Sequence, residues 1–551
     1  MMRYMKAEQA LRRPAIVFIS PSEQRRVVFA SSLGTIFEWY DFYLYATLAP
    51  FFASLFFPPG NDTAALLSAF ATYAAGFLIR PFGAIVFGRI GDRLGRKYAF
   101  LITIVIMGIS TFAVGLLPTY HYIGWLAPLM LVFLRLAQGF ALGGEYGGAA
   151  TYVAEHTPAS RRGWATSWIQ TTATIGFFLS LLIVLLCRST MSDEAFREWG
   201  WRLPFVISIL LLILSAYIRL RLNESPLYEH MKEAGQISPA PISESFFRSP
   251  NAQKVLFILL GATAGQGVVW YTGQFYALFF LQITLKADDS VAYQLMMLAL
   301  LLGTPFFVFF GWLSDKIGRK PIILTGCLLA SLTYFPLFAT LTKAVNPALD
   351  EFQRTTSIVL TTNKESCHFH LFVGPWSEFS DCDRAKDYLT KLGLSFTTVH
   401  ATGGVEESVK VGDLPAQPIG NWDEENRRDN IILALTIAGY PVKAEIADMN
   451  VPIVVLVLVL MMIYVCMVYG PMAAFLVDYF PTRIRYTSLS LPYHIGNGWF
   501  GGMLPLIATA IVAASGNIYY GLWYPVSVAL ITVTIGLVFL RRPPVGDYDP
   551  H

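Results

Sequence analysis

Five ionisable side chains lie inside long apolar runs of this chain of 551 residues. They are the acids Glu38, Asp41 and Glu145 and the arginines Arg80 and Arg135. A charge inside an apolar span is expensive, so residues of this kind are functional by default. A carboxylate balanced between burial and a nearby arginine can bind and release a proton near neutral pH. The three acids are therefore predicted to carry a coupling proton. The alternative is that they permanently neutralise an arginine.

Helical spacing places several of these residues on shared faces. Glu38, Asp41 and Tyr45 follow one another at i, i+3 and i+7, and Arg135 and Gln138 are spaced i, i+3. Residues at these spacings share one face of a helix. With a rise of about 1.5 Å per residue, Glu38 lies close to the middle of its span. Tyr45 and Gln138 are predicted to line a substrate site beside the charged residues.

Arg80 and Arg135 are the candidate anion ligands. Each guanidinium is a planar fork that can hold a carboxylate through two hydrogen bonds. Both arginines are therefore predicted to bind substrate. The alternative for Arg80 is a structural ion pair with Glu38 or Asp41.

The second half of the chain has no comparable charges in the middle of its apolar runs. It offers Gln266, Trp270 and Gln274 at i, i+4 and i+8, and Tyr493 with Asn497 at i, i+4. Their hydrogen-bonding and stacking groups suit the wall of a pocket, so these five are also predicted to bind substrate. The alternative is that the aromatic residues serve packing or interfacial anchoring.

The composition indicates which elements position these residues. Hydrophobic residues make up 55% of the chain and charged residues only 14%, and the net charge of +3 excludes a general nucleic-acid binder. A membrane-spanning helix needs about 20 apolar residues. The apolar runs predict twelve such helices, at 27–56, 64–88, 98–117, 124–154, 163–187, 202–222, 255–283, 290–313, 321–341, 450–477, 486–514 and 518–540.

Basic residues concentrate in the short loops on one side of these helices, which predicts that both termini are cytoplasmic. A long polar insert between the ninth and tenth helices then lies outside the cytoplasm. The predicted organisation is a basic tail (1–26), an N-terminal six-helix bundle (27–222), a linker (223–254), the first half of a C-terminal bundle (255–341), the insert (342–449), the last three helices (450–541) and a cytoplasmic tail (542–551).

A repeated loop indicates that the two bundles are related. The loop after the second helix reads GRIGDRLGRK (88–97), and the loop after the eighth reads GWLSDKIGRK (311–320). The first copy resembles the G-x-x-x-D-R-x-G-R-K signature of the major facilitator superfamily. The resemblance implies two six-helix bundles and a role in conformational gating for Gly88, Asp92, Arg93, Gly95, Arg96, Lys97, Asp315, Arg319 and Lys320. The alternative is that the basic residues only fix topology.

A narrower resemblance is to the metabolite:proton symporter family. GTIFEWYDFYLYA in the first helix, the Arg80–Pro81 pair and RLAQGFALGGEYGGAATYVAEHTPASRRG (135–163) carry it. The family contains proton-driven carriers of shikimate, α-ketoglutarate and other organic acids, and of proline and betaines. The long insert is atypical of its best-known members.

The expected function is proton-coupled symport of a small organic anion by alternating access. The alternatives are a zwitterion carrier of the betaine or proline type and a transporter-derived receptor that uses the insert. The chain contains no Walker loop, and we expect neither an enzyme nor a bound cofactor, nucleotide or nucleic acid. The resemblance implies a multi-pass protein of the bacterial inner membrane that functions as a monomer.

The insert is predicted to be a small α+β cap. SIVLTT (357–362), CHFHLFV (367–373) and SFTTVHA (395–401) suggest strands, and CDRAKDYLTKLG (382–393) suggests a helix ending at Gly393. Cys367 and Cys382 are predicted to form a disulfide in an oxidising compartment. A metal site with His368 and His370 is the alternative, and we expect no metal.

Overall fold

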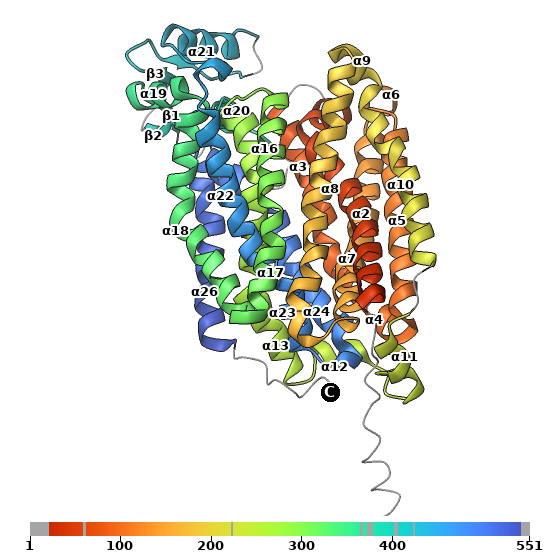
Figure 1. Cartoon of the computed structure of the whole chain (residues 1–551). Helices are drawn as coiled ribbons and strands as arrows, with labels where there is room; N and C mark the ends of the chain where they lie inside the picture. The colour runs from red at the N-terminus through yellow and green to blue at the C-terminus, as the bar shows by residue number, and fades with distance from the viewer. Residues whose placement is uncertain are drawn as a thin grey trace, which may run out of the picture.

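The computed structural model describes residues 21–58, 62–221, 224–363, 367–371, 378–401, 406–422 and 425–540. Long helices run side by side, and the insert lies at one end of the helices of the C-terminal half (Figure 1). In this part of the chain, eleven helices are long and apolar enough to cross a membrane. The first helix, α2 (Pro21–Phe56), is also long but carries Glu38 and Asp41. With α2, the long helices number twelve, as predicted.

The N-terminal half contains the first six of these membrane-spanning elements. Its helices are α2, α3 (Asp62–Leu78) with α4 (Arg80–Leu94), α5 (Arg96–Leu116), α7 (Leu126–Glu155), α8 (Arg162–Thr190) and α10 (Leu203–Leu220), with short helices α6 (Tyr120–Ile123) and α9 (Asp193–Glu198) between them. The second element is broken at Ile79, before Pro81, because proline at the start of α4 cannot donate the next helical hydrogen bond. The break places Arg80 at the first position of α4.

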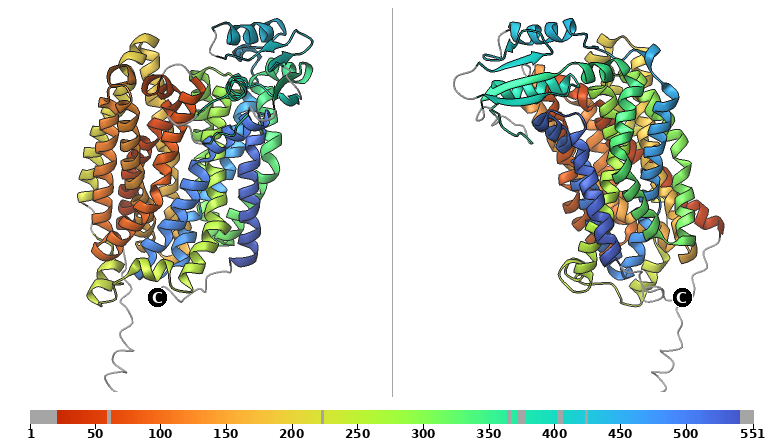
Figure 2. Two further views of the ribbon diagram at one scale, coloured as in Figure 1. Left: turned by 180° about the vertical axis from the view of Figure 1, so that it is seen from behind. Right: turned by 90° about the vertical axis from the view of Figure 1, so that its left-hand side faces the viewer.

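A linker with α11 (Pro226–Glu233) and α12 (Pro241–Phe246) leads to the C-terminal half. The helices of that half are α13 (Asn251–Ile258), α14 (Ala264–Tyr271), α15 (Ala277–Phe279), α16 (Asp289–Gly303), α17 (Pro305–Ile317), α18 (Arg319–Val345), α22 (Val451–Tyr469), α23 (Met472–Tyr479), α24 (Arg485–His494), α25 (Leu504–Ser515) and α26 (Trp523–Phe539). We call the end of the helices beside α11 and α12 the linker end, and the opposite end the insert end (Figures 1 and 2).

Two elements of the C-terminal half contain π-helical turns. Three interrupt the element that begins with α13, at η3 (Leu259–Thr263), η4 (Thr272–Tyr276) and η5 (Phe280–Thr284). The fourth, η8 (Ile495–Gly502), joins α24 to α25. Such turns loosen the helical ladder and occur frequently at functional sites. Gln266 and Asn497 lie on these two elements.

Glycines let α3 and α4 approach α7 closely. A Cβ atom at Gly139 would lie 1.8 Å from the carbonyl oxygen of Gly76, and one at Gly143 would lie 2.2 Å from the carbonyl oxygen of Arg80. No larger residue fits at either position without moving the backbone. This contact brings Arg80 and Arg135 into one layer of the N-terminal half.

The insert is a small α+β unit. It contains α19 (Pro347–Thr355), β1 (Ile358–Asn363), α20 (Asp381–Lys391), β2 (Thr397–Ala401), β3 (Ser408–Val411), β4 (Gln417–Pro418) and α21 (Glu425–Ile437). The sheet has the order β2-β1-β3-β4, with β1 parallel to β2 and antiparallel to β3. The strands predicted at 357–362 and 395–401 correspond to β1 and β2, and Gly393 follows α20 with φ of +71°.

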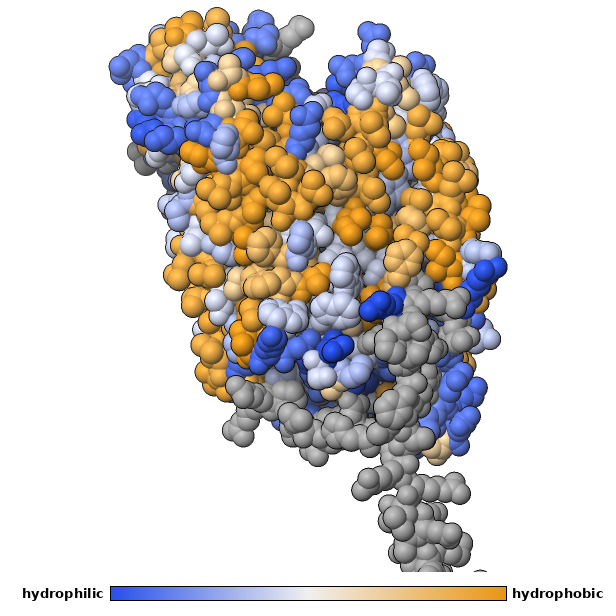
Figure 3. Space-filling view, viewed as in Figure 1, coloured by the Kyte–Doolittle hydropathy of each residue, from blue (hydrophilic) through white to orange (hydrophobic). Residues whose placement is uncertain are grey.

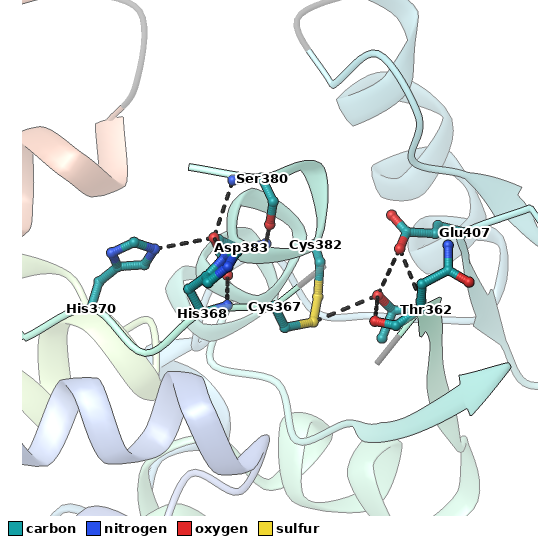
Figure 4. Close-up of a disulfide and its surroundings, with 9 residues drawn as sticks. Thr362, Cys367, His368, His370, Ser380, Cys382, Asp383 and Glu407 are labelled. Carbon is teal, nitrogen blue, oxygen red and sulfur yellow. Dashed lines mark hydrogen bonds and ion pairs between the residues drawn. A yellow bond between two sulfur atoms is a disulfide. The ribbon is translucent and has the colours of Figure 1, made fainter. Parts of the chain in front are cut away.

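The strand predicted at 367–373 is wrong. Residues 367–371 form no strand, and 372–373 lie outside the described residues. The alternating apolar pattern is overridden by two local links, because Cys367 is joined to Cys382 and the backbone N–H of His368 donates to Asp383. Both links tie this segment to the first turn of α20 instead of to the sheet (Figure 4).

The surface agrees with a membrane protein. Figure 3 shows apolar residues over the helices and hydrophilic residues gathered toward both ends. Large apolar side chains such as Phe133, Leu210 and Leu332 are more than half exposed on the helices. An apolar surface that extends over many helices is stable only against lipid or another apolar surface.

Candidate functional site

The predicted ionisable residues all lie buried in the N-terminal half. Glu38 and Asp41 come from α2, Arg80 from α4, and Arg135 and Glu145 from α7. The expectation that these five residues pair among themselves is wrong in one respect. No ion pair joins either arginine to an acid among the described residues.

Arg219 supplies the missing positive charge. Its Nη2 lies 2.5 Å from Oε1 of Glu38 and 3.7 Å from Oε1 of Glu145. Arg219 is close to the end of an apolar run, where the sequence alone groups it with the basic residues that flank the membrane. The structure buries it in the last turn of α10. The signal that could have found it is the polar stripe formed with Ser215, four residues earlier, on an otherwise apolar helix.

A hydrogen-bonded chain runs from Arg135 to Thr111, whose hydroxyl donates its own hydrogen to the carbonyl oxygen of Met107. Nη1 of Arg135 donates to Oε1 of Gln138 over 2.7 Å, and Nε2 of Gln138 donates to the Thr111 hydroxyl over 2.7 Å. The Thr111 side chain lies within hydrogen-bonding reach of Asp41, which in turn lies beside Glu38. The chain from Arg135 therefore ends beside Asp41, next to the acids that pair with Arg219. Thr111, on α5, was missed by sequence reasoning because a lone threonine in an apolar helix is unremarkable.

Arg80 is surrounded by aromatic rings. Its guanidinium carbon lies 4.0 Å from the ring centre of Phe77, 4.3 Å from that of Phe42 and 5.9 Å from that of Trp39. These contacts are cation–π interactions. The side chain is fully buried, and its three nitrogens make no well-directed hydrogen bond to a described residue, while the Tyr271 hydroxyl lies within reach of the guanidinium. The alternative of an ion pair with Glu38 or Asp41 is not formed in this structure.

Arg135 shares one of these rings. Its guanidinium carbon lies 4.4 Å from the ring centres of both Phe42 and Tyr45. Tyr45 uses its hydroxyl to donate to the carbonyl oxygen of Ala69 on α3, which fixes the ring under the arginine. Nε and Nη2 of Arg135 have no partner in the described part of the chain. Since Phe42 contacts both arginines, the two forks flank the same ring.

The C-terminal half faces this site with polar aromatic residues. Tyr43 on α2 stacks on Trp270 with ring centres 5.8 Å apart, and Tyr271 meets Phe77 edge-on at 5.3 Å. The hydroxyl of Tyr43 and the indole N–H of Trp270 have no partner among the described residues. Buried donors normally find an acceptor. Here two stacked side chains, one from each half, present two donors without a partner in the described part of the chain.

Other predicted residues of the C-terminal half are bonded to one another. The amides of Gln266 and Asn497 exchange two hydrogen bonds, at 3.0 and 2.7 Å. The hydroxyl of Tyr493 lies 2.8 Å from that of Tyr469, and the ring stacks on Tyr146 at 3.5 Å. Gln274 donates to the sulfur of Met462 over 3.8 Å, and its amide oxygen has no partner in the described part of the chain.

The first repeated loop joins the two halves at the linker end. Oδ2 of Asp92 accepts hydrogen bonds from the backbone N–H of Thr487, at 2.9 Å, and from its hydroxyl, at 2.6 Å. Thr487 lies in the first turn of α24, where N–H groups lack helical partners. Oδ1 of Asp92 pairs with Arg96 at 3.0 Å. Gly88 lies against the same threonine, because a Cβ there would be 2.9 Å from its Cα.

The second loop makes the symmetry-related contact. Both oxygens of Asp315, on α17, accept from the first N–H groups of α8, those of Gly163 and Trp164, each at 2.8 Å. Arg319 pairs with Asp315 at 3.5 Å and also contacts Asp478. Each half therefore caps a helix of the other half with the aspartate of its repeat.

The remaining loop residues bind the same end. The carbonyl of Arg93 accepts from the Tyr228 hydroxyl, Lys97 donates to the carbonyl of Leu220, Lys320 donates to that of Leu540, and Gly95 takes φ of +120°. Sequence reasoning missed Glu155, which pairs with Arg96 at 3.6 Å and with Arg485 at 3.5 Å. It precedes the polar His156–Thr157 pair at the end of α7, so it looks like an ordinary loop acid.

The two halves also meet at the insert end. Arg188 of α8 pairs with Asp289 of α16 at 2.8 Å, and the Tyr293 hydroxyl donates to the carbonyl of Thr47 over 3.0 Å. The two halves therefore contact each other at both ends, with the aromatic layer between these contacts.

Known proteins resemble this chain in sequence. Two family models match, "Sugar (and other) transporter" over residues 27–240 and "MFS/sugar transport protein" over residues 148–377. The shikimate transporter of Escherichia coli (strain K12) is 36% identical over 332 residues, which cover 60% of this chain and 75% of that protein. The alpha-ketoglutarate permease of the same strain is 36% identical over 334 residues, with the same coverage. The proline/betaine transporter of Salmonella typhimurium (strain LT2) is 34% identical over 343 residues, 60% of this chain and 67% of that protein.

Solved structures show the same fold. A structure of the proton:xylose symporter XylE aligns with a TM-score of 0.60 at 15% identity, and covers 95% of this chain and 97% of that one. A partially occluded inward-open structure of XylE from E. coli aligns equally well, over 94% and 98% of the two chains.

Proposed function

This chain is a membrane transporter of the major facilitator superfamily and belongs to the family of the shikimate, alpha-ketoglutarate and proline/betaine transporters; we propose that it carries a small organic anion together with a proton, by alternating access. The observation that supports an anion is the group of unpartnered donors around Arg80 and Arg135. A buried donor without an acceptor is costly, and a carboxylate would satisfy several at once.

The arrangement of the two arginines favours an anion with two carboxylates or with a carboxylate and further hydroxyls. Both guanidinium carbons lie over Phe42, at 4.3 and 4.4 Å from its centre, so a substrate of metabolite size can reach both. Tyr43, on α2, and Trp270, from the C-terminal half, each add one donor that has no partner among the described residues. We infer that Arg80 is the main substrate ligand and that Arg135 is the second.

We place proton coupling on the acids around Arg219. Protonation of Glu38 or Glu145 would remove a negative charge that holds Arg219, and would free the arginine for the other acid. The Gln138–Thr111 chain runs from the substrate arginine Arg135 to the side of Asp41, which lies near Glu38. Substrate arrival at Arg135 would therefore change the field at Asp41. The proton is the proposed coupling ion, with no other cofactor.

A zwitterion is the second candidate substrate. The aromatic rings of Tyr43, Trp270 and Tyr271 could hold a quaternary or secondary ammonium by cation–π contact while Arg80 holds the carboxylate. Close relatives with the name proline/betaine transporter support the same candidate. A receptor that uses the insert is a weaker alternative.

We further propose that the protein lies in the bacterial inner membrane as a monomer, with the linker end in the cytoplasm. The basic residues of the repeated loops, at the linker end, support this orientation. Labelling of single introduced cysteines from either side of the membrane would test this orientation.

Uptake into proteoliposomes tests the proposed function. Labelled shikimate, α-ketoglutarate, proline or glycine betaine is added outside vesicles whose external pH is lower than the internal pH. We expect accumulation of one of the two organic acids, which stops when a protonophore collapses the gradient. Accumulation of proline or betaine alone would select the zwitterion candidate. Uptake that follows a sodium gradient alone would contradict proton coupling, and specific binding without any uptake would favour the receptor.

A further inference from the structure

The disulfide of the insert lies at one edge of its sheet. Cys367 follows the carboxyl end of β1, and Cys382 is the second residue of α20, the crossover helix between the parallel strands β1 and β2. Figure 4 shows the two sulfurs between the strand and the helix. In parallel βαβ units this edge is where ligands bind, and thiol–disulfide enzymes place a reactive cysteine at the start of such a helix.

The two sulfurs differ in accessibility. Cys382 is fully buried, whereas Cys367 is partly exposed. Cys367 is followed by His368 and Phe369, both of which project outward, with 62% of the His368 side chain exposed. A thiol that approaches from solvent therefore reaches the sulfur of Cys367 first.

The first turn of α20 acts on Cys382 in two opposite ways, because the helix N-terminus favours a thiolate there whereas full burial of the side chain opposes it. Helix N-termini carry partial positive charge and stabilise anions. The neighbouring carboxylate of Asp383 is already engaged, since it accepts from the backbone of His368 at 2.7 Å, from the ring of His370 at 3.1 Å and from Ser380 at 3.1 Å. Burial opposes the charge of Asp383, but these hydrogen bonds outweigh burial and hold its pKa below the usual value.

The surroundings of Cys367 lack such support. Its sulfur lies 3.6 Å from the hydroxyl oxygen of Thr362, and that hydroxyl donates its hydrogen to the carboxylate of Glu407 over 2.9 Å. The threonine therefore has no hydrogen left for a Cys367 thiolate. Because Cys367 is the more exposed partner, attack on Cys367 with departure of Cys382 is the favoured direction.

We propose that Cys367–Cys382 is a thiol–disulfide exchange site that is entered at Cys367 by a small thiol of the glutathione type. In the first step the external thiolate forms a bond to the sulfur of Cys367, the Cys367–Cys382 bond breaks, and Cys382 leaves as a thiolate. A second thiolate then attacks the external sulfur. The bond between that sulfur and Cys367 breaks, Cys367 leaves as a thiolate, and the two small thiols depart joined as one disulfide. The cysteine pair has then gained two electrons in total.

The exchange acts on a helix that bridges the two halves of the transporter. α20 packs against η5 and α25 of the C-terminal half and against α3 of the N-terminal half. The disulfide holds the first turn of this helix to the segment that follows β1. Its reduction should loosen α20 where it crosses between the halves. The inference concerns a site outside the membrane and does not depend on the proposed substrate or on proton coupling.

Mapping of the mixed disulfide in the intact protein tests the proposal. The full-length protein in nanodiscs is incubated with reduced glutathione, free thiols are blocked with N-ethylmaleimide, and peptides are analysed by mass spectrometry. We expect the glutathione adduct on Cys367. An adduct on Cys382, or no reduction under conditions that reduce the denatured protein, would overturn the proposal.

Single-cysteine variants provide a second measurement. With oxidised glutathione, Cys382→Ser should form an adduct at Cys367 at least about tenfold faster than Cys367→Ser forms one at the buried Cys382. Equal rates in two folded variants would show that the site has no preferred entry. Hydrogen exchange of residues 381–391 in the wild-type protein should increase on reduction, and unchanged exchange would refute the loosening of α20. Melting curves identify a variant that fails to fold.

Discussion

Arg80 combines complete burial, aromatic contacts and unused hydrogen-bond donors. A positive charge in such a place is stable only with a compensating partner. The aromatic rings supply part of the compensation, and the proposed substrate carboxylate supplies the rest. This balance explains how the protein can bury Arg80 and still have affinity for an anion.

Replacement of Arg80 by lysine should separate charge from geometry. Lysine keeps the positive charge but loses the fork, and a lost charged hydrogen bond weakens binding by roughly tenfold or more. The substrate dissociation constant, measured by calorimetry or scintillation proximity, should rise by that factor with little change in melting temperature. Arg89→Lys, on the exposed face of the same helix, is the matched control. Unchanged affinity in a folded Arg80→Lys protein would exclude Arg80 from the site and leave Arg135.

Arg219 stabilises two buried carboxylates at once. Arg219→Gln should lower stability by about 3–5 kcal/mol, because Glu38 and Glu145 remain buried without their cation. Addition of Glu38→Gln should recover part of that loss. The measurement is thermal unfolding in detergent, with the exposed Arg221→Gln as control. A single variant as stable as wild type would show that the ion pairs contribute nothing to folding.

At the scale of elements, α20 holds two acids of opposite behaviour. Burial, with a further effect from the charge of Asp383, raises the pKa of Asp387 to about 7. The Asp383 pKa is lowered by its hydrogen bonds. The folded insert therefore keeps a proton on Asp387 that the unfolded chain releases above about pH 4. Because of the raised pKa of Asp387, the stability of the folded insert should fall as pH rises from about 4 to 7.

Asp387→Asn should remove that part of the pH dependence. Each unit by which the Asp387 pKa differs between the folded and unfolded states corresponds to about 1.4 kcal/mol. At pH 8, α20 should therefore be more protected from hydrogen exchange in the variant than in the wild-type protein. Hydrogen exchange of residues 381–391, corrected for intrinsic rates, is the measurement. Asp383→Asn is the control with the opposite sign. The lowered pKa of Asp383 contributes stability above about pH 4, so this variant should be less protected there than the wild-type protein. Parallel pH profiles for wild type and Asp387→Asn would contradict the assignment.

At the scale of the whole molecule, the two halves are joined at both ends. The linker end carries the reciprocal caps by Asp92 and Asp315 and the ion pairs of Glu155, whereas the insert end carries the half-exposed pair Arg188–Asp289. A partly exposed ion pair contributes at most about 1 kcal/mol. The insert end is therefore expected to open more easily than the linker end.

Loosening one end at a time should shift the molecule in opposite directions. Asp92→Asn weakens the linker end and should raise the population open at that end by about tenfold, since a lost charged hydrogen bond is worth at least about 1.4 kcal/mol. Asp289→Asn should instead lower that population. Spin labels at the exposed positions Arg89 and Lys316, one in each half, report the distance by pulsed electron resonance. If both variants changed the population open at the linker end in the same direction, the two ends would not act in opposition and the prediction would be wrong.

The sequence by itself determined the fold class and the repeat. Twelve apolar runs and two copies of one loop are local patterns, since a bilayer forces each span to satisfy its own backbone hydrogen bonds. Local spacing likewise identified Glu38, Asp41, Arg80, Arg135 and Glu145, because charge inside an apolar run is visible without any neighbour.

Only the tertiary structure decided which of these charges meet. Arg219 is far from Glu38 and Glu145 in the chain, and its place near a helix end resembles that of a topological arginine. The same holds for Thr487, which completes the contact of Asp92 from the other half. In the insert, the tie of Cys367 and His368 to α20 overrode a strand-like pattern. Pairing depends on which helices pack together, and that packing is set by glycines and side-chain shapes on several elements at once.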